Sequence, residues 1–347
     1  MITPRPRRAI CILVLALLGP LLGLAAGPAA LERFEFSEPH MGTHCRLVLY
    51  AASHAAAATA ATAAFARLRE LDLKLSDYKD DSELMRLCKQ PAGTPQPVSP
   101  ELFTVLEIGQ EIAEQSGGAF DVTIGPLAQI WRRARRQARL PDASLITQAR
   151  QRVGFRLLQL DRAARTATLA RSDMRLDLGG IAKGYAADEL LAVISAAGWP
   201  RAMIVLGGEV VAGEPPLDAK GWKVEIAAVP GPPMESDVSP TFLLLARAAV
   251  STSGDAEQYV LLDGERYSHV VDPRTGWALR ASPQVTVVAR KGIWADALAT
   301  AASVLETSAA VRLIEQHAPA AGLLRRPTPD TRWEETATRG WSDWLRR

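Results

Sequence analysis

The stretch YSHVVDPRTG, from Tyr267 to Gly276, carries a histidine where a plain turn needs none. Strand-forming residues lead into a Pro and Gly turn, and His269 is one of only five histidines in 347 residues. Because histidine titrates near neutral pH, it is the side chain most often used as a general base. A histidine that satisfies the hydrogen bonds of the turn is the alternative. The stretch therefore indicates either proton transfer or a structural turn.

A second candidate is LDLGGIAKGY, where Asp177 precedes a Gly-Gly turn and Lys183 follows it. A strand that enters a helix through such a turn leaves free N–H groups, which favour a phosphate together with the helix dipole. Lys183 opposes that dipole by about 0.3–1 kcal/mol, so we expect compensation by Asp177 or by a bound phosphate. A lysine that points into solvent is the alternative. The turn matches neither the P-loop nor the GxGxxG spacing.

The motif ADALAT places Asp296 and Thr300 four residues apart, on one face of an expected helix. Carboxylate and hydroxyl oxygens suit Mg²⁺, with substrate phosphates and water completing the coordination. Alternatively, Asp296 complements the helix dipole and Thr300 bonds to the preceding turn. Spacing alone favours this second interpretation.

Two further stretches carry aromatic residues beside carboxylates. In GAFDVTIGPL, Phe120 could stack on a ring while Asp121 binds a purine or ribose edge, although turn capping explains Asp121 nearly as well. In LSDYKDDSEL, Tyr78 could stack on a ring and Ser82 could cap a short helix. None of these signals identifies a function alone.

Both strands and helices are expected to position these residues. Periodicity and stop signals predict strands around a Met-Gly-Thr turn and again over much of the second half of the chain, as well as a C-terminal hairpin through Trp333 and Trp341. Helices are expected over residues 51–75, 101–116, from the Gly-Gly turn to Gly198, and 292–307. Strands and helices neither alternate strictly nor segregate, so we expect an α+β (mixed α/β) fold in two lobes.

Composition excludes some partners. The net charge is +2 with both signs interspersed, and 48% of residues are hydrophobic, so a well-packed core is expected and a nucleic-acid partner is not. The arginines of WRRARRQAR stand without an aromatic platform and indicate a solvated helix face. Cys45 and Cys88 are expected to be buried thiols without chemistry, although an oxidising compartment would permit them to pair.

Residues 1–30 have the layout of a secretory signal, with arginines before an apolar run and small residues after it. An uncleaved anchor is the alternative, but the run is short and Pro20 interrupts it. No cysteine follows the run where a lipoprotein signal requires one. We expect an exported protein whose residues 31–347 form the functional domain.

Eight motifs taken together resemble one family. The order of these motifs and the residues within them are similar to those of the ApbE family, the FAD:protein FMN transferases. The similarity extends from about Phe34 to the C-terminal hairpin. The motifs are MGT, LSDYKDDSEL, GAFDVTIGPL, LDLGGIAKGYAAD, VLGGE, STSGDAEQY, YSHVVDPRTG and ADALAT.

The resemblance implies a two-lobed fold with FAD in the cleft between the lobes, and a Mg²⁺-dependent enzyme that joins FMN to a Thr or Ser hydroxyl of an acceptor protein and releases AMP. It implies that the FAD pocket is lined by Met41, Tyr78, Ala119, Phe120, Asp121, Asp177 and Lys183. It implies that the Gly180 carbonyl, Asp296 and Thr300 hold the metal.

In this interpretation His269 lies beside the pyrophosphate and takes the proton of the incoming hydroxyl, while Lys183 and Mg²⁺ balance charge on the phosphate oxygens. The family's acceptors are subunits of membrane redox complexes and extracytoplasmic electron carriers, which implies a periplasmic or membrane-associated location. The chain departs from the family at Cys88 and at Glu209, where Asn is usual, and Glu209 could add a second carboxylate for metal.

Two other functions remain open at this point. An FAD pyrophosphatase would use the same pocket and metal, with water replacing the acceptor hydroxyl. A non-catalytic exported flavin-binding protein would not need Lys183, His269, Asp296 and Thr300 together.

Overall fold

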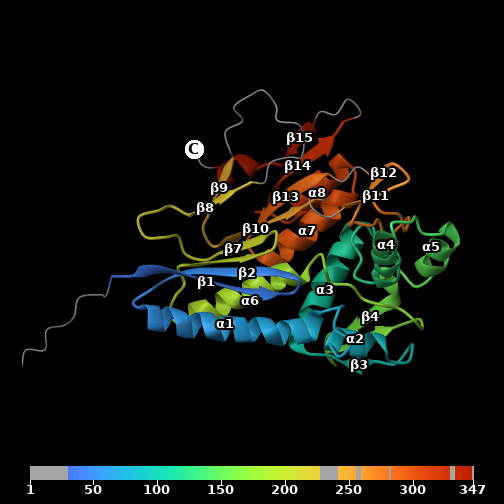
Figure 1. Ribbon diagram of the computed structural model, residues 1–347, viewed down its shortest axis with the longest axis horizontal. Helices are drawn as coiled ribbons and strands as arrows, with labels where there is room; N and C mark the ends of the chain where they lie inside the picture. The colour runs from blue at the N-terminus through green and yellow to red at the C-terminus, as the bar shows by residue number, and fades with distance from the viewer. Residues whose placement is uncertain (1–29, 227–240, 255–258, 281–282, 329–332, 346–347) are drawn as a thin grey trace, which may run out of the picture. The chain divides into compact units, whose positions relative to one another are not determined.

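The computed structural model is built on an eight-stranded antiparallel sheet of order β1-β2-β6-β7-β10-β13-β14-β15 (Figure 1). Its strands are β1 (Glu32–His40), β2 (Thr43–Ala51), β6 (Ala202–Leu206), β7 (Glu209–Ala212), β10 (Ala248–Ser253), β13 (Gln284–Ala289), β14 (Ala321–Pro327) and β15 (Trp333–Ala337). The structure describes residues 30–226, 241–254, 259–280, 283–328 and 333–345. The expected signal segment therefore lies outside the described residues, apart from Ala30.

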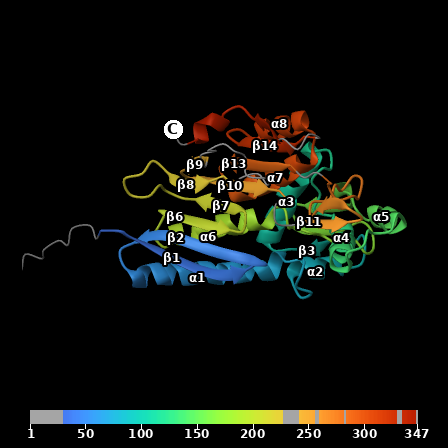
Figure 2. The same ribbon diagram turned by 45° about the horizontal axis from the view of Figure 1, so that its top comes forward.

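Four helices cover one face of this sheet: α1 (His54–Leu75), α6 (Ala182–Ala196), α7 (Gly292–Val304) and α8 (Thr307–Gln316) (Figure 2). Helix α1 begins where the Ser53 side chain accepts the N–H of Ala56 at 3.2 Å, and its alanines give it high helix propensity. Helix α7 is buried almost all round, since it packs against α6, α8 and strands β10 and β13. The small residues of ADALATAAS permit this close packing.

Strand β2 shows how the core is divided between the two faces of the sheet. Leu47 and Leu49 point into the cluster beneath the helices, whereas Val48 points into a second cluster on the opposite face. This alternation is the period of two expected of a strand. Strands β8 (Trp222–Glu225) and β9 (Phe242–Leu245) contribute to the second cluster.

The remaining elements gather beyond one end of the helical layer (Figure 1). They are α2 (Glu83–Cys88), α3 (Pro100–Gln115), α4 (Gly125–Gln137), α5 (Ala143–Arg150), β3 (Gln96–Pro97), β4 (Leu158–Asp161), β5 (Thr166–Leu169), β11 (Tyr259–Leu262) and β12 (Glu265–Ser268). The mixed α/β fold is thus confirmed, and the helices expected at 51–75 and 101–116 begin and end within three residues of α1 and α3.

Residues Leu31–Arg347 form one compact unit. Its division into two lobes stays a prediction. Within the part of the chain that the structure describes, no helix is both long and apolar enough to span a bilayer.

Candidate active site

Helices α6 and α7 meet through contacts repeated once per turn. A Cβ atom added to Gly180, just before α6, would lie 2.9 Å from Thr300 Oγ1, and four residues later Gly184 N donates to Asp296 Oδ2 at 3.0 Å. The numbers rise along α6 and fall along α7, so the helices are antiparallel. Because four residues make about one turn of an α-helix, a single register aligns both contacts. The structure thus brings the Gly-Gly turn and ADALAT together, as a metal site shared by Gly180, Asp296 and Thr300 would require.

The next turn of the same register fixes the start of α7. Asp188 on α6 accepts the N–H groups of Gly292 at 2.7 Å and Ile293 at 3.1 Å, which serves as an N-cap that the helix itself lacks. Burial raises the pKa of Asp188 to about 6, although these two N–H groups act to lower it. A Cβ on Gly184 would lie 2.2 Å from the Gly292 carbonyl oxygen, so only glycine permits this approach.

Lys183 in the first turn of α6 does not point into solvent. Its Nζ lies 3.1 Å from Glu209 Oε1 and 3.9 Å from Asp296 Oδ2, and it donates to the Gly179 carbonyl at 3.2 Å. Burial acts to lower the pKa of Lys183, but the Asp296 and Glu209 carboxylates outweigh burial and raise it. Glu209 is the nearest ion-pair partner of Lys183, which sequence reasoning did not assign, and the expected Asp177 charge also acts to raise the pKa of Lys183. Compensation by a bound phosphate stays a prediction.

Glu209 begins β7 and is only 4% exposed. Burial raises its pKa to about 7, the Lys183 ammonium acts to lower it, and the Asp296 carboxylate adds to the increase. Among the described residues, its Oε2 atom is buried and has no hydrogen-bond partner. A buried carboxylate oxygen without a partner is costly, and either a cation or a proton shared with the Asp296 carboxyl group would give it one.

The carboxylate of Asp177 is held by its own turn and by α4. Oδ1 accepts the N–H of Gly179 at 2.8 Å, and Oδ2 accepts Arg132 Nη2 at 2.7 Å. Arg132 also bonds Asp77, and its guanidinium lies 4.3 Å from the centre of the Tyr78 ring. The expected solvated face is therefore wrong for Arg132. Sequence reasoning missed this residue because only the fold brings Asp77 and Asp177 to one point.

Trp131, the neighbour of Arg132, anchors the histidine segment. Its indole N–H donates to the Gly276 carbonyl at 2.9 Å, and its ring lies 5.3 Å from that of buried Tyr267. Asp272 closes the intervening turn by accepting the N–H of Arg274 at 2.9 Å. His269 lies half-buried between these fixed points. Its role as a base stays a prediction.

The GAFDVTIGPL stretch lies beside the segment that carries Asp177, because Asp177 N donates to the Val122 carbonyl at 2.8 Å. The strand expected before the Gly-Gly turn is reduced to an isolated bridge between Ile124 and Arg175. Asp121 is buried and accepts both the N–H and the hydroxyl of Thr123, at 2.8 and 2.7 Å, so it caps this turn. Ala119 and Phe120 belong to the main core. The predicted contacts of Ala119, Phe120 and Asp121 with the flavin stay predictions.

The Met-Gly-Thr turn lies near the turn that precedes Glu209. Met41 and Gly42 both have positive φ, at 49° and 74°, as the two central residues of a tight hairpin require. A Cβ on Gly207 would lie 3.4 Å from Thr43 Cγ2. An open cavity of about 540 Å³ is lined by the Met41 turn and α1 residues.

The oxygen atoms near Lys183 are hard donors, namely the Glu209 and Asp296 carboxylates and the Gly179 carbonyl, and the Thr300 hydroxyl lies beside Gly180. No group of three or more His, Cys, Asp or Glu side chains that could hold a metal occurs within the described ranges. Two carboxylates with a hydroxyl and a carbonyl fit a hard divalent ion such as Mg²⁺, which keeps several waters or phosphate oxygens.

Known proteins share this architecture. The model of the ApbE family matches residues 41–324. An FAD:protein FMN transferase of Treponema pallidum (strain Nichols) is 33% identical over 312 residues, covering 85% of this chain and 84% of the relative. Another from Klebsiella pneumoniae (strain 342) is 30% identical over 281 residues, covering 80% and 79%.

Solved structures agree with these relatives. The flavin transferase ApbE from Vibrio cholerae matches with a TM-score of 0.79 at 26% identity, over 91% of this chain and 100% of that one. The apo flavinyl transferase ApbE of Pseudomonas stutzeri matches with 0.78 at 28% identity, over 91% and 98%. From its sequence and its fold alike, the chain belongs to the ApbE family.

Proposed function

We propose that this protein is an FAD:protein FMN transferase that depends on Mg²⁺. The observation that carries the proposal is the antiparallel register of α6 and α7, which gathers Lys183, Asp296 and Thr300 at the Gly-Gly turn of an ApbE-family chain. The relatives named FAD:protein FMN transferase support the choice of substrate. A binding protein without turnover would not need this concentration of charge.

In the proposed reaction a Thr or Ser oxygen of the acceptor protein forms a bond to the FMN phosphorus. The bond from that phosphorus to the bridging oxygen breaks, and AMP leaves with the bridging oxygen. His269 takes the hydroxyl proton, and it lies in the chain between Tyr267, whose ring packs on Trp131, and the Asp272 turn. Lys183 binds and orients the phosphate oxygens, since its ammonium remains protonated.

Mg²⁺ would be held by the Gly180 carbonyl, Asp296 and Thr300. When bound, it supplies charge neutralisation for the phosphate oxygens. Tyr78, exposed beneath Arg132, offers a ring face for stacking, and Asp177 is oriented by Arg132 toward the same turn.

An FAD pyrophosphatase would use the same groups with water as acceptor, and no feature of the described residues favours it. We further propose that residues 1–30 are an export signal and that the protein acts in the periplasm or at the inner membrane. Its acceptor would be a redox-complex subunit or an extracytoplasmic electron carrier.

The test mixes the mature protein with FAD, Mg²⁺ and a candidate acceptor, and measures the acceptor by mass spectrometry. We expect an added FMN on one Thr or Ser, lost when that residue is alanine and reduced at least about a hundredfold in His269→Ala, the usual contribution of a general base. AMP release without an adduct on any acceptor would instead indicate the pyrophosphatase. Near-normal transfer by His269→Ala, with FAD still bound, would remove His269 from the mechanism.

A further inference from the structure

Glu209 is held rigidly at the site by the sheet. It is the first residue of β7, and its backbone pairs with Leu206 on β6 and with Ser251 on β10. The tight Gly207-Gly208 turn precedes it, so its side chain enters the cluster from the sheet while Lys183 and Asp296 enter from α6 and α7. Three separate elements thus converge on one position.

The charges in this cluster do not balance. When both carboxyl groups are ionised, Glu209 and Asp296 present two negative charges to one ammonium, that of Lys183. Oε1 of Glu209 receives the Lys183 hydrogen bond at 3.1 Å, but Oε2 is buried and has no hydrogen-bond partner among the described residues. A bound cation would give this oxygen a partner and offset the excess negative charge.

We propose that Glu209 is a direct carboxylate ligand of the divalent cation, in addition to the Gly180 carbonyl, Asp296 and Thr300. The inference rests on the metal dependence in the proposed function and deepens it. Asn is usual here in the family that the sequence resembles, so this chain would hold the ion with one more negative charge. An oxygen ligand set with two carboxylates should bind the ion even before FAD supplies its phosphates.

The competing interpretation is that Glu209 serves only as the counter-ion of Lys183. The two interpretations separate when Lys183 is removed. In a Lys183→Met background a counter-ion has no partner left, whereas a metal ligand still contributes to binding. The effect of Glu209→Gln in that background therefore measures ligation itself.

The experiment titrates the flavin-free full-length protein with Mn²⁺, follows the free ion by electron paramagnetic resonance, and then adds Mg²⁺ as competitor. Mn²⁺ is a suitable probe because it accepts the same carboxylate, carbonyl and water ligands. We expect Glu209→Gln to weaken binding by at least about tenfold, the lower end of what lost supporting groups cost metal sites. The loss should be similar in the wild-type and the Lys183→Met backgrounds.

Glu214→Gln is the matched control, since Glu214 follows β7 and pairs with Arg201 and Arg247 outside the cluster. It should leave Mn²⁺ binding unchanged. Should Glu209→Gln misfold by circular dichroism, Glu209→Asn provides the second variant, with the same expected loss.

Unchanged binding in Glu209→Gln, or a loss that disappears in the Lys183→Met background, would overturn the inference while leaving the proposed metal dependence intact. A wild-type protein that binds neither ion without flavin would overturn the inference as well. The proposed metal dependence is tested separately, by measuring whether FMN transfer to an acceptor requires Mg²⁺.

Discussion

The thiol of Cys88 accepts a hydrogen bond from the backbone N–H of Leu176 at 3.3 Å, one residue before Asp177. Burial raises the pKa of this thiol, so it remains protonated and unreactive. Cys45 and Cys88 are both free thiols; Cys45 is buried as expected, whereas Cys88 is only partly buried. An Asn in place of Cys88 could accept the same N–H through its amide oxygen, which accounts physically for the departure from the family pattern.

This bond leads to a prediction about stability. Leu176 is fully buried, so Cys88→Ala should leave its N–H without an acceptor and lower the free energy of unfolding by about 1–3 kcal/mol. Cys88→Asn should lose much less, because it restores an acceptor. Urea unfolding followed by circular dichroism measures both. Equal losses in the two variants would mean that volume, rather than the hydrogen bond, determines the cost.

The sequence predicts which site residues lie together only when both residues belong to the same helix. Asp296 and Thr300 are one turn apart, so their shared face could be predicted from spacing alone. The pairing of Lys183 with Glu209 joins a helix to a strand 26 residues away, and that of Arg132 with Asp177 spans 45 residues. No local periodicity reports such contacts, so the sequence indicates neither the pairing of Glu209 with Lys183 nor the bond of Arg132 to Asp177.

Among the elements, the α6 and α7 pair determines the geometry of the site, because its register aligns Gly180, Gly184 and Asp188 with Thr300, Asp296 and Gly292. The two helices and their Gly-Gly start were predictable from glycine stops and apolar runs. Their antiparallel contact was not, since it depends on glycines that allow the backbones to approach. The separate helix α8 was also missed, because one apolar run was expected to end at residue 307.

Gly184→Ala tests the importance of this register. Its Cβ would lie 2.2 Å from a carbonyl oxygen of α7 and 2.8 Å from Asp296 Cβ, and neither can rotate away. We expect the free energy of unfolding to fall by about 3 kcal/mol or more, at or above the upper part of the usual range for overpacking. Flavin transfer should fall as well, because the helices must separate at Asp296. Thermal unfolding and the acceptor mass assay measure the two effects.

Gly264→Ala is a useful comparison for that variant. Gly264 has φ of +80° but no atom within 4 Å of an added Cβ. The free energy of unfolding of Gly264→Ala should therefore fall by about 1–2 kcal/mol, through backbone strain alone. Transfer activity should be unaffected. If Gly184→Ala were no worse than Gly264→Ala, the close contact of α6 with α7 would not be required.

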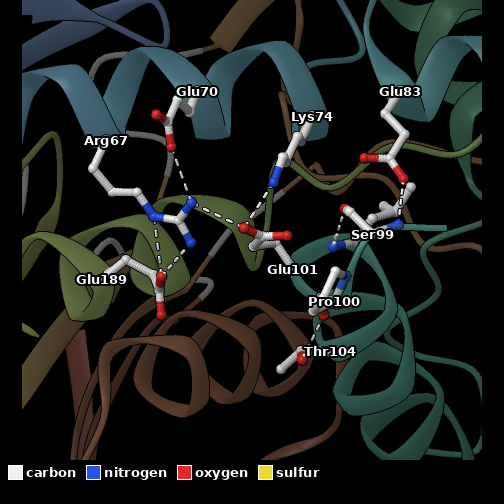
Figure 3. Close-up of polar contacts among 10 residues, drawn as sticks. Arg67, Glu70, Lys74, Glu83, Ser99, Pro100, Glu101, Thr104 and Glu189 are labelled. Atoms are coloured by element: carbon white, nitrogen blue, oxygen red, sulfur yellow. Dashed lines mark hydrogen bonds and ion pairs between the residues drawn. The ribbon is translucent and has the colours of Figure 1, made fainter. Parts of the chain in front are cut away.

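Across the whole molecule, a polar hub ties the active-site helix to the outer layer (Figure 3). Arg67 on α1 contacts Glu189 on α6 at 2.6 Å and Glu101 on α3 at 2.9 Å, while Lys74 lies 2.7 Å from Glu101. The individual helices could be predicted from sequence, but this network joins positions up to 122 residues apart and depends on their packing. It stabilises the layer from which Lys183 projects.

The hub gives the protein a specific response to acid. Burial acts to raise the pKa of Glu101, but hydrogen bonds from Lys74 and Arg67 outweigh it and lower the pKa to about 2, from 4.5. Above pH 4.5 the carboxylate is ionised whether the chain is folded or unfolded, and its stabilisation is complete. Between about pH 4.5 and 2 the unfolded chain takes up the proton first, so stability falls as pH falls, by up to about 3 kcal/mol from this group.

Glu101→Gln should therefore lower stability at pH 7 and flatten its decline between about pH 4.5 and 2, as measured by urea midpoints across that range. Glu70→Gln is the matched control from the same hub, because Glu70 also contacts Arg67 but its side chain is 63% exposed. Its partner interaction is screened by water, so it should contribute at most about 1 kcal/mol and leave the acid slope nearly unchanged. An equally flattened slope in both variants would show that the total charge of the hub, rather than the buried contacts of Glu101, controls the loss of stability in acid.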